Sequence, residues 1–462
     1  MGHPARAGRA EVDGLSKKMR LLPLVGATYF MVAGGPYGLE DIIGKAGYGR
    51  ALLLLLLVPL VWSLPTSLMV GELASSIPEE GGYYIWVKRA LGPFWGFQEA
   101  WLSLTASVFD MALYPVTFVL YLTRVAPGWT AGNRGTLWAL AVVLGCALWN
   151  LRGAKAVGGG SVWLFAVMLS PFAALIGFGL WQGLVLHAVG GGLAALTKPV
   201  AQPDMAAALS VCLWNYMGWD NASTVAQEVD DPQRTYPRAM LISAALVAVT
   251  YVVPLTAVAV AGIPAADFST GAWADAARRV GGTGVFGVGL ALAVVLGGTI
   301  SGVGMFNALM MSYTRVPYAL AEERLLPKAF ARRNGAGAPW VSILVMAVAW
   351  GLAVRISFER LISIDLVLYG AALLLEFISL VVLRRKEPEM VRPFRVPGGM
   401  VGAVLAGVGP TALILFAIYA ARGERVMGLP ALGFAGVLGC CGPLFYSVAK
   451  RGGGKKDARD AR

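Results

Sequence analysis

Five acidic side chains lie inside stretches of this chain that are otherwise apolar. A carboxylate in such surroundings must either hold a proton or meet a positive charge, because an unpaired buried charge is costly. No lysine or arginine lies at comparable depth in the same stretches, apart from Lys45 at the end of the first one. These acids therefore indicate that the chain binds a cation from outside or carries protons. They are Glu40, Asp41, Asp110, Asp220 and Glu376.

The composition is that of a polytopic membrane protein. The chain has 462 residues, of which 57% are hydrophobic and only 14% are charged, whereas soluble proteins carry about 25% charged residues. A net charge of +12 in such a chain marks cytoplasmic loops and does not indicate nucleic-acid binding. The four cysteines show no ligand spacing, and no nucleophile–base or metal constellation is present. We therefore expect neither an enzyme nor a bound metal or cofactor.

Twelve apolar segments predict twelve transmembrane helices in the lipid bilayer. The predicted fold is an all-α integral membrane protein, with a single transmembrane domain over 21–449 between polar tails at 1–20 and 450–462. The segments lie near 21–46, 51–75, 95–123, 136–151, 161–184, 205–226, 238–262, 283–313, 340–356, 361–383, 401–421 and 429–449.

The basic residues predict the orientation of these segments. With the N-terminus inside, 27 of the 38 lysines and arginines fall on the inner side. Cytoplasmic loops carry such an excess of basic residues. Both tails are therefore expected to be cytoplasmic, in a plasma or inner cell membrane.

Two of the segments carry residues that interrupt a helix. The first contains Gly34-Gly35-Pro36-Tyr37-Gly38, and proline removes a backbone donor and clashes one turn back. The sixth contains a run of polar residues between Asn215 and Thr224. Broken backbone at membrane depth is tolerated where it lines a cavity, although a short helix, a turn and a second helix at the surface is the alternative for the first break. Matched breaks five segments apart predict two inverted repeats, about 21–184 and 205–383, with extra helices at about 401–449.

Three loop stretches resemble the amino acid–polyamine–organocation transporter superfamily. Gln227–Ala239 reads QEVDDPQRTYPRA, Arg315–Lys328 reads RVPYALAEERLLPK, and Arg384–Pro397 contains RRKEP and RPFRVP. Each is similar to a motif of that superfamily. The resemblance implies the LeuT-type fold, in which helices 1 and 6 are discontinuous, and transport by alternating access.

Within the superfamily the chain most resembles the plant and protozoan polyamine-uptake transporters. The stretches that carry this resemblance are GGPYGLED (Gly34–Asp41), PFWGFQ (Pro93–Gln98), DMALYPV (Asp110–Val116), NYMGWDNASTVAQEV (Asn215–Val229) and LLEFISLV (Leu374–Val381).

The resemblance also implies a substrate site at the two breaks. Amino-acid members carry Gly-Ser-Gly at the first break, where free N–H groups bind the substrate carboxylate, but Pro36 has no N–H. Asp220 follows Gly218-Trp219 where amino-acid exchangers carry asparagine. Glu40, Asp41, Asp110 and Asp220 are then expected to face one cavity, with nearby aromatic rings adding cation–π contacts. The expected substrate-binding residues are Gly34, Gly35, Pro36, Tyr37, Glu40, Asp41, Asp110, Trp214, Tyr216, Trp219 and Asp220, with Trp214 at the gate position of the family.

Proton coupling is expected to use a buried carboxylate. Many prokaryotic members carry a coupling lysine in the fifth segment, whereas this chain has Met168 at the aligned position. The candidates are Glu40, Asp110 and Glu376. A structural, hydrogen-bonded acid is the alternative for each of them, and the stronger one for Glu376.

Together these features predict a secondary active transporter that imports polyamines or related organic cations by proton symport. An amino-acid transporter or exchanger of the same superfamily is the alternative. A transport-fold sensor is a weaker third possibility. The sequence does not fix the oligomeric state.

Overall fold

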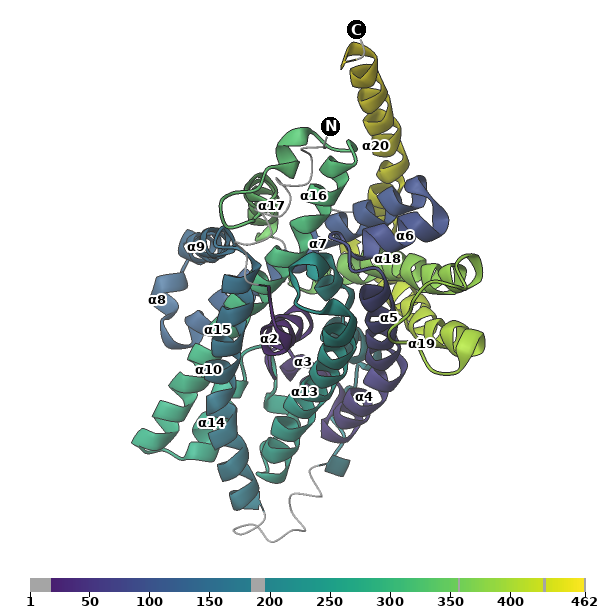
Figure 1. Cartoon of the computed structure of the whole chain (residues 1–462). Helices are drawn as coiled ribbons and strands as arrows, with labels where there is room; N and C mark the ends of the chain where they lie inside the picture. Colours follow the sequence, from purple (N-terminus) through teal and green to yellow (C-terminus); the bar gives the residue numbers. More distant parts are fainter. Residues whose placement is uncertain (1–17, 184–195, 356–357, 427–428, 461–462) are drawn as a thin grey trace.

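The computed structural model describes residues 18–183, 196–355, 358–426 and 429–460. Helices make up most of this part of the chain, and its only strands are β1 (Arg425–Val426) and β2 (Leu429–Pro430), which form a short antiparallel pair. Figure 1 shows the helices packed into a bundle with α2 and α3 near its middle. The predicted all-α class is confirmed for the described residues. Of the predicted N-terminal tail, residues 1–17 lie outside them.

The helices up to residue 183 are α2 (Leu21–Val32), α3 (Glu40–Ala46), α4 (Tyr48–Val61), α5 (Ser63–Ser76), α6 (Tyr83–Leu91), α7 (Pro93–Val125), α8 (Pro127–Thr130), α9 (Asn133–Asn150) and α10 (Ala154–Trp181). Those after residue 195 are α12 (Met205–Trp214), η2 (Asp220–Glu228), α13 (Pro232–Val260), η3 (Ala265–Asp267), α14 (Trp273–Gly281), α15 (Val285–Tyr313), α16 (Arg315–Glu322), η4 (Lys328–Ala331), α17 (Trp340–Ala353), α18 (Phe358–Lys386), α19 (Gly399–Ala420), η5 (Ala421–Gly423) and α20 (Ala431–Asp460).

Eight helices in the described ranges are long and apolar enough to cross a membrane, and three shorter helices are also apolar. This number supports a multi-pass membrane protein. Each predicted segment coincides with at least one helix, although the segment placed near 161–184 begins earlier, at Ala154. At the other end, α20 continues to Asp460, beyond residue 450 where the tail was predicted to begin. The eight spans are Tyr48–Ser76, Pro93–Val125, Ala154–Trp181, Pro232–Val260, Val285–Glu322, Ile364–Lys386, Gly399–Gly423 and Ala431–Arg451.

The first interruption occurs where the sequence predicted it. Helix α2 ends at Val32, and α3 begins only at Glu40. Between them Gly35 and Gly38 have φ angles of +71° and +91°, a conformation that glycine adopts without steric cost. The predicted break near Gly34–Gly38 is therefore confirmed.

The second interruption is confirmed as well. Helix α12 ends at Trp214, and the chain resumes as the 3₁₀ helix η2 at Asp220. Gly218 lies between them with a φ angle of +91°. The predicted break at Asn215–Asp220 thus coincides with the change from one helix to the next.

The two breaks contact each other, as predicted. The Asn215 side-chain amide donates a hydrogen bond of 3.2 Å to the carbonyl oxygen of Gly38. The backbone also approaches closely at Gly218, where an added Cβ would lie 2.3 Å from the carbonyl oxygen of Met31. Each break therefore forms one wall of the space between them.

The interrupted helices are also joined where α2 begins and η2 ends. The N–H of Met19, just before α2, donates to the carbonyl oxygen of Glu228 at 2.8 Å. The N–H of Asp230 in turn donates to the carbonyl oxygen of Met19 at 2.8 Å. The buried Arg315 side chain adds an ion pair of 2.9 Å to the Glu228 carboxylate. These contacts hold the two ends together.

Candidate functional site

A small cavity lies where the two breaks meet. Its walls come from the end of α2, from α7, α12 and η2, and from α15 and α18. Its volume is about 10 Å³, which is about the space that one water molecule requires. The cavity is therefore too small to hold a ligand larger than water in this conformation. Its lining residues are Met31, Val32, Asp110, Tyr114, Trp214, Met217, Gly218, Asn221, Tyr313 and Tyr369.

Asp110 is the one predicted acid that lines this cavity. The hydroxyl of Tyr114, one turn along α7, donates to its Oδ1 at 2.5 Å. The indole N–H of Trp214 donates to the same oxygen at 3.3 Å. The rings of Tyr114 and Trp214 stack with their centroids 6.1 Å apart. Two aromatic donors thus fix the carboxylate at the cavity wall, and the predicted Asp110 and Trp214 come together.

Asp220 is connected to the cavity by a hydrogen bond from a cavity-lining tyrosine. It is 2% exposed and does not line the cavity itself. The hydroxyl of Tyr369, which does line it, donates to Asp220 Oδ1. The N–H of Gly218 donates to the same hydroxyl at 3.0 Å. A charge on Asp220 therefore acts on the cavity across Tyr369.

Asp365 is an acid of this region that the sequence reasoning missed. It lies one turn before Tyr369 on α18, is 1% exposed, and its Oδ2 has no hydrogen-bond partner among the described residues. It interacts electrostatically with Asp110 and Asp220. The signal that could have found it is the one that found Asp110, namely a single acid within an apolar run. The cavity-lining tyrosines Tyr114, Tyr313 and Tyr369 were missed too, because tyrosine in such a run reads as packing.

Glu40 does not line the cavity, which corrects the expectation that four carboxylates face it together. The side chain is fully buried, and its Oε2 accepts the N–H of Gly38 at 2.7 Å. Its Oε1 accepts the hydroxyl of Tyr121 and the N–H of Gly271 at 3.1 Å. Glu40 begins α3, and free N–H groups near a helix N-terminus attract a carboxylate away from other partners. The side chain thus ties α3 to α7 and to the turn before α14.

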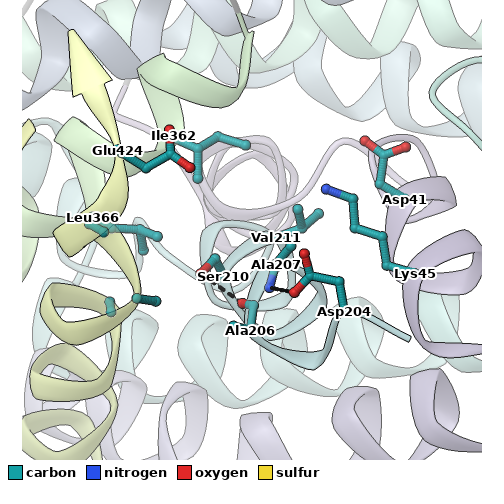
Figure 2. A pocket seen from close by; sticks show the side chains of 13 residues that line it. Asp41, Lys45, Asp204, Ala206, Ala207, Ser210, Val211, Ile362, Leu366 and Glu424 are labelled. Atoms are coloured by element: carbon teal, nitrogen blue, oxygen red, sulfur yellow. Dashed lines mark hydrogen bonds between the residues drawn. The ribbon is translucent and has the colours of Figure 1, made fainter. Parts of the chain in front are cut away.

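Asp41 also points away from the cavity, for the same physical reason. Its two oxygens accept hydrogen bonds of 3.0 Å from the N–H and the hydroxyl of Thr270. Asp41 lines a second pocket of about 290 Å³, together with Lys45, Asp204 and Glu424. Figure 2 shows Lys45 reaching between Asp41 and Asp204 in that pocket.

The second pocket and the central cavity share helix α12. Val211 lines the pocket, and Trp214 lines the cavity about one turn further along the helix. The pocket therefore lies next to the cavity on the side where α3 ends. It brings acids from three separate parts of the chain close to the site.

The remaining predicted residues of the first break form its scaffold. The carbonyl oxygen of Gly34 accepts the Ser301 hydroxyl at 2.7 Å, and that of Pro36 accepts the Trp273 indole N–H at 2.8 Å. The hydroxyl of Tyr37 donates to the carbonyl oxygen of Val294 at 2.6 Å.

Gly35 packs beside Met168, since a Cβ added to it would lie 3.0 Å from the Met168 methyl group. Met168, the fifth-segment residue that aligns with the lysine expected in many prokaryotic members, thus packs against the first break. An ammonium group would lie within reach of the same backbone, and this chain places a thioether there instead.

Tyr216 and Trp219 play a similar part at the second break. The Tyr216 hydroxyl donates to the carbonyl oxygen of Leu55 at 2.8 Å, and the Trp219 indole donates to the carbonyl oxygen of Tyr216 at 2.9 Å. Neither ring lines the cavity. Tyr216 thus braces the unwound backbone against α4, and Trp219 braces it from within the break.

Glu376 lies on α18, buried and outside the cavity. Neither of its carboxylate oxygens has a hydrogen-bond partner among the described residues. It interacts electrostatically with Asp220 and with Glu99 of α7.

The chemistry of the central cavity suits an alkylammonium group. None of its lining residues is a lysine, arginine or histidine. An ammonium could donate to Asp110, and the faces of Trp214 and Tyr114 attract a cation. Methylene groups would pack against Met31 and Val32, which also line the space.

Comparison with known proteins gives a consistent result. Residues 25–435 match the family described as "Amino acid permease". The polyamine transporter RMV1 of Arabidopsis thaliana is 33% identical over 414 residues, which are 89% of this chain and 82% of that protein. The polyamine transporter PUT1 of Oryza sativa subsp. japonica is 34% identical, with 86% and 73% covered. The serine/threonine exchanger SteT of Bacillus subtilis is 24% identical, with 96% and 99% covered.

The family match covers most of the chain, and the plant relatives are identical to it at about a third of the aligned residues. The superfamily resemblance drawn from the loop motifs is thereby confirmed, and these relatives are transporters, not enzymes. With its many apolar helices and its broken helices around a small cavity, the chain belongs to the amino acid permease family of membrane transporters.

Proposed function

We propose that this transporter imports polyamines or related organic cations by alternating access, with proton symport. The observation that carries the substrate class is the Asp110 carboxylate on the cavity wall, where the lining residues offer no basic side chain to neutralise it. Asp220 and Asp365 add negative charge close by. The plant relatives that are named polyamine transporters support the same class.

An amino-acid transporter or exchanger is the second candidate, and the likeness to the serine/threonine exchanger over nearly the whole chain favours it. An amino acid needs donors for its carboxylate as well as an acceptor for its ammonium. Pro36 offers no N–H, and the N–H of Gly38 is occupied by Glu40. The backbone at the first break therefore has fewer free donors than an amino-acid site needs.

For the architecture we propose twelve crossings arranged as two inverted five-helix repeats of the LeuT type, with two further helices. The repeats would cover about 21–184 and 205–383, and the extra helices about 401–449. The matched interruptions after α2 and α12, which contact each other, support this arrangement.

For the orientation we propose that both termini are cytoplasmic. We expect a cysteine at Asn334, in a cysteine-free background, to escape an impermeant maleimide in intact cells and to react after permeabilisation. Asn334 lies in a loop beside the basic residues Arg332 and Arg333. Lys198→Cys, at an exposed position predicted to lie outside, should react in intact cells and serves as the control. Reaction at position 334 in intact cells would reverse the orientation.

The substrate class is tested with purified protein in proteoliposomes. We expect saturable uptake of radiolabelled spermidine that excess unlabelled putrescine inhibits and excess leucine does not. The physical reason is that a diamine or triamine pairs with several acids, whereas leucine brings a carboxylate into the same negative field. Uptake of leucine without uptake of spermidine would replace the polyamine proposal by the amino-acid alternative.

A further inference from the structure

Two buried glutamates outside the cavity lack the partners that buried acids require. Glu99 lies near the start of α7 and Glu376 lies on α18, and both are 0% exposed. Of their four carboxylate oxygens only Oε1 of Glu99 has a hydrogen-bond partner in the described part of the chain, the Ser103 hydroxyl at 2.7 Å. The neighbouring Tyr83 hydroxyl of α6 is likewise unpaired. Burying polar groups in this way costs free energy unless a ligand completes them.

Among the described residues, no positive charge compensates the two glutamates. Neither takes part in an ion pair with any described lysine or arginine. The groups that interact with Glu376 are Glu99 of α7, Asp220 of η2, and Tyr83 and Tyr369. Tyr84 and Asp220 also interact with Glu99. All of these groups are acids or phenols, so a bound proton is the simplest way to reduce the repulsion.

Symport requires the substrate and the proton to be bound at the same time. Asp110 faces the cavity, and a proton on it would remove the charge that an ammonium needs. Three donors, from Gly38, Gly271 and Tyr121, stabilise Glu40 as a carboxylate, so a proton on it would weaken these hydrogen bonds. A proton carrier should therefore be a buried acid that neither lines the cavity nor accepts several hydrogen bonds, as is true of Glu99 and Glu376.

On the basis of the proposed function, we propose that the Glu99–Glu376 pair carries the co-transported proton, separately from the substrate cation. A proton passes from a hydronium ion to one carboxylate of the pair: an O–H bond of hydronium breaks, leaving water, and the new O–H bond makes the carboxyl group neutral. On release that bond breaks, its electrons remain on the carboxylate, and the proton passes to water on the other side. Glu376 interacts with Asp220, which binds the cavity residue Tyr369. The charge of the pair thus influences the electrostatic potential in the cavity.

The pair lies on the side of the cavity that is predicted to be cytoplasmic. Helix α7 begins at Pro93, directly after Lys88 and Arg89 of α6, and Glu99 lies in its second turn. Asp110, by contrast, is three turns further along the same helix. In the proposed orientation Glu99 therefore lies closer to the cytoplasmic end of α7 than Asp110 does.

The test uses the double variant Glu99→Gln/Glu376→Gln in proteoliposomes that contain a pH-sensitive dye. An inside-negative potassium diffusion potential drives radiolabelled spermidine inward, because the substrate itself is cationic. The wild type should take up spermidine and acidify the lumen. The double variant should take up spermidine within threefold of the wild type, with substrate-dependent acidification reduced at least tenfold. Glu79→Gln, at an exposed glutamate near the same face, should behave as the wild type.

Each outcome separates the pair from the general function. Acidification by the double variant at the wild-type ratio to uptake would overturn the proposal for the pair while leaving proton symport intact. Uptake by the wild type without acidification would overturn symport itself, and the role of the pair with it. If the double variant is not stably folded, Glu376→Gln alone should lose acidification, and Glu376→Asp should restore part of it. Equal acidification by Glu376→Gln and the wild type would contradict the proposal.

Discussion

Asp110→Asn is expected to weaken spermidine binding at least tenfold. The change removes the one carboxylate that lines the cavity and keeps its shape. Losing one desolvated charge pair costs about 2–5 kcal/mol, and ~1.4 kcal/mol corresponds to one decade in affinity. The asparagine carbonyl can still accept from Tyr114 and Trp214, so the fold should persist. Titration calorimetry of purified wild type and variant measures the effect.

The matched control is Asp231→Asn, which removes the same charge from an exposed position before α13. Asparagine tolerates the left-handed conformation of this residue, whose φ angle is 42°. Its spermidine affinity should equal that of the wild type. Equal affinity of the Asp110→Asn protein and the wild type would show that Asp110 is not the cation anchor. If leucine binds, its affinity should fall less than the affinity for spermidine in the Asp110→Asn protein.

Gly218→Ala is expected to lower the melting temperature strongly and to abolish transport. The residue adopts a φ angle of +91°, and a Cβ there would lie 2.3 Å from the carbonyl oxygen of Met31. A non-glycine residue in this backbone conformation costs about 1–3 kcal/mol by itself. The clash adds to this cost, because the Met31 carbonyl oxygen belongs to the backbone and cannot move away by a change of side-chain rotamer. Relief would push the two breaks apart. Thermal unfolding followed by fluorescence-detected size-exclusion chromatography checks this.

Gly177→Ala is the corresponding control. Gly177 lies within α10, is exposed, and a Cβ there would meet open space. Alanine is a better helix former than glycine by about 1 kcal/mol, so this variant should be as stable as the wild type or more so. If Gly218→Ala and Gly177→Ala have the same melting temperature, the close approach of the breaks does not contribute to stability.

The interruptions could be predicted because few other structures explain them. Glycine and proline in the middle of a membrane-length stretch, as at Gly35 and Pro36, prevent a continuous helix whatever surrounds them. The polar run after Trp214 likewise cannot face lipid. Both signals depend only on residues that are neighbours in the sequence, so they can be recognised without the tertiary structure.

The grouping of the acids could not be predicted in the same way. A sequence gives the depth of Glu40 along its helix, but not which neighbours from distant parts of the chain will supply donors to it. Tyr121 and Gly271 occupy Glu40, whereas Tyr369 connects Asp220 with the cavity. These partners decide which acids face the central space, and they come from helices far away in the sequence.

The position of Asp365 illustrates the same limit. It stands near the start of a predicted segment, where an acid is readily assigned to the membrane surface. Packing of α18 against α7 instead buries it beside Asp110 and Asp220. The apolar run around it could mark Asp365 as a candidate, but only the tertiary structure shows that it lies near these two acids.

The backbone link at Met19 has a mechanical consequence. Its hydrogen bonds to Glu228 and Asp230 couple the start of α2 to the end of η2, so these two pieces cannot hinge independently at that end. If the cavity opens toward this side, either α2 and η2 move together as one rigid unit, or the extended stretch around Met19 first separates from η2. In the first case residues 18–20 move together with α2 and η2. In the second case the hydrogen bonds of Met19 must break before the cavity can widen on this side.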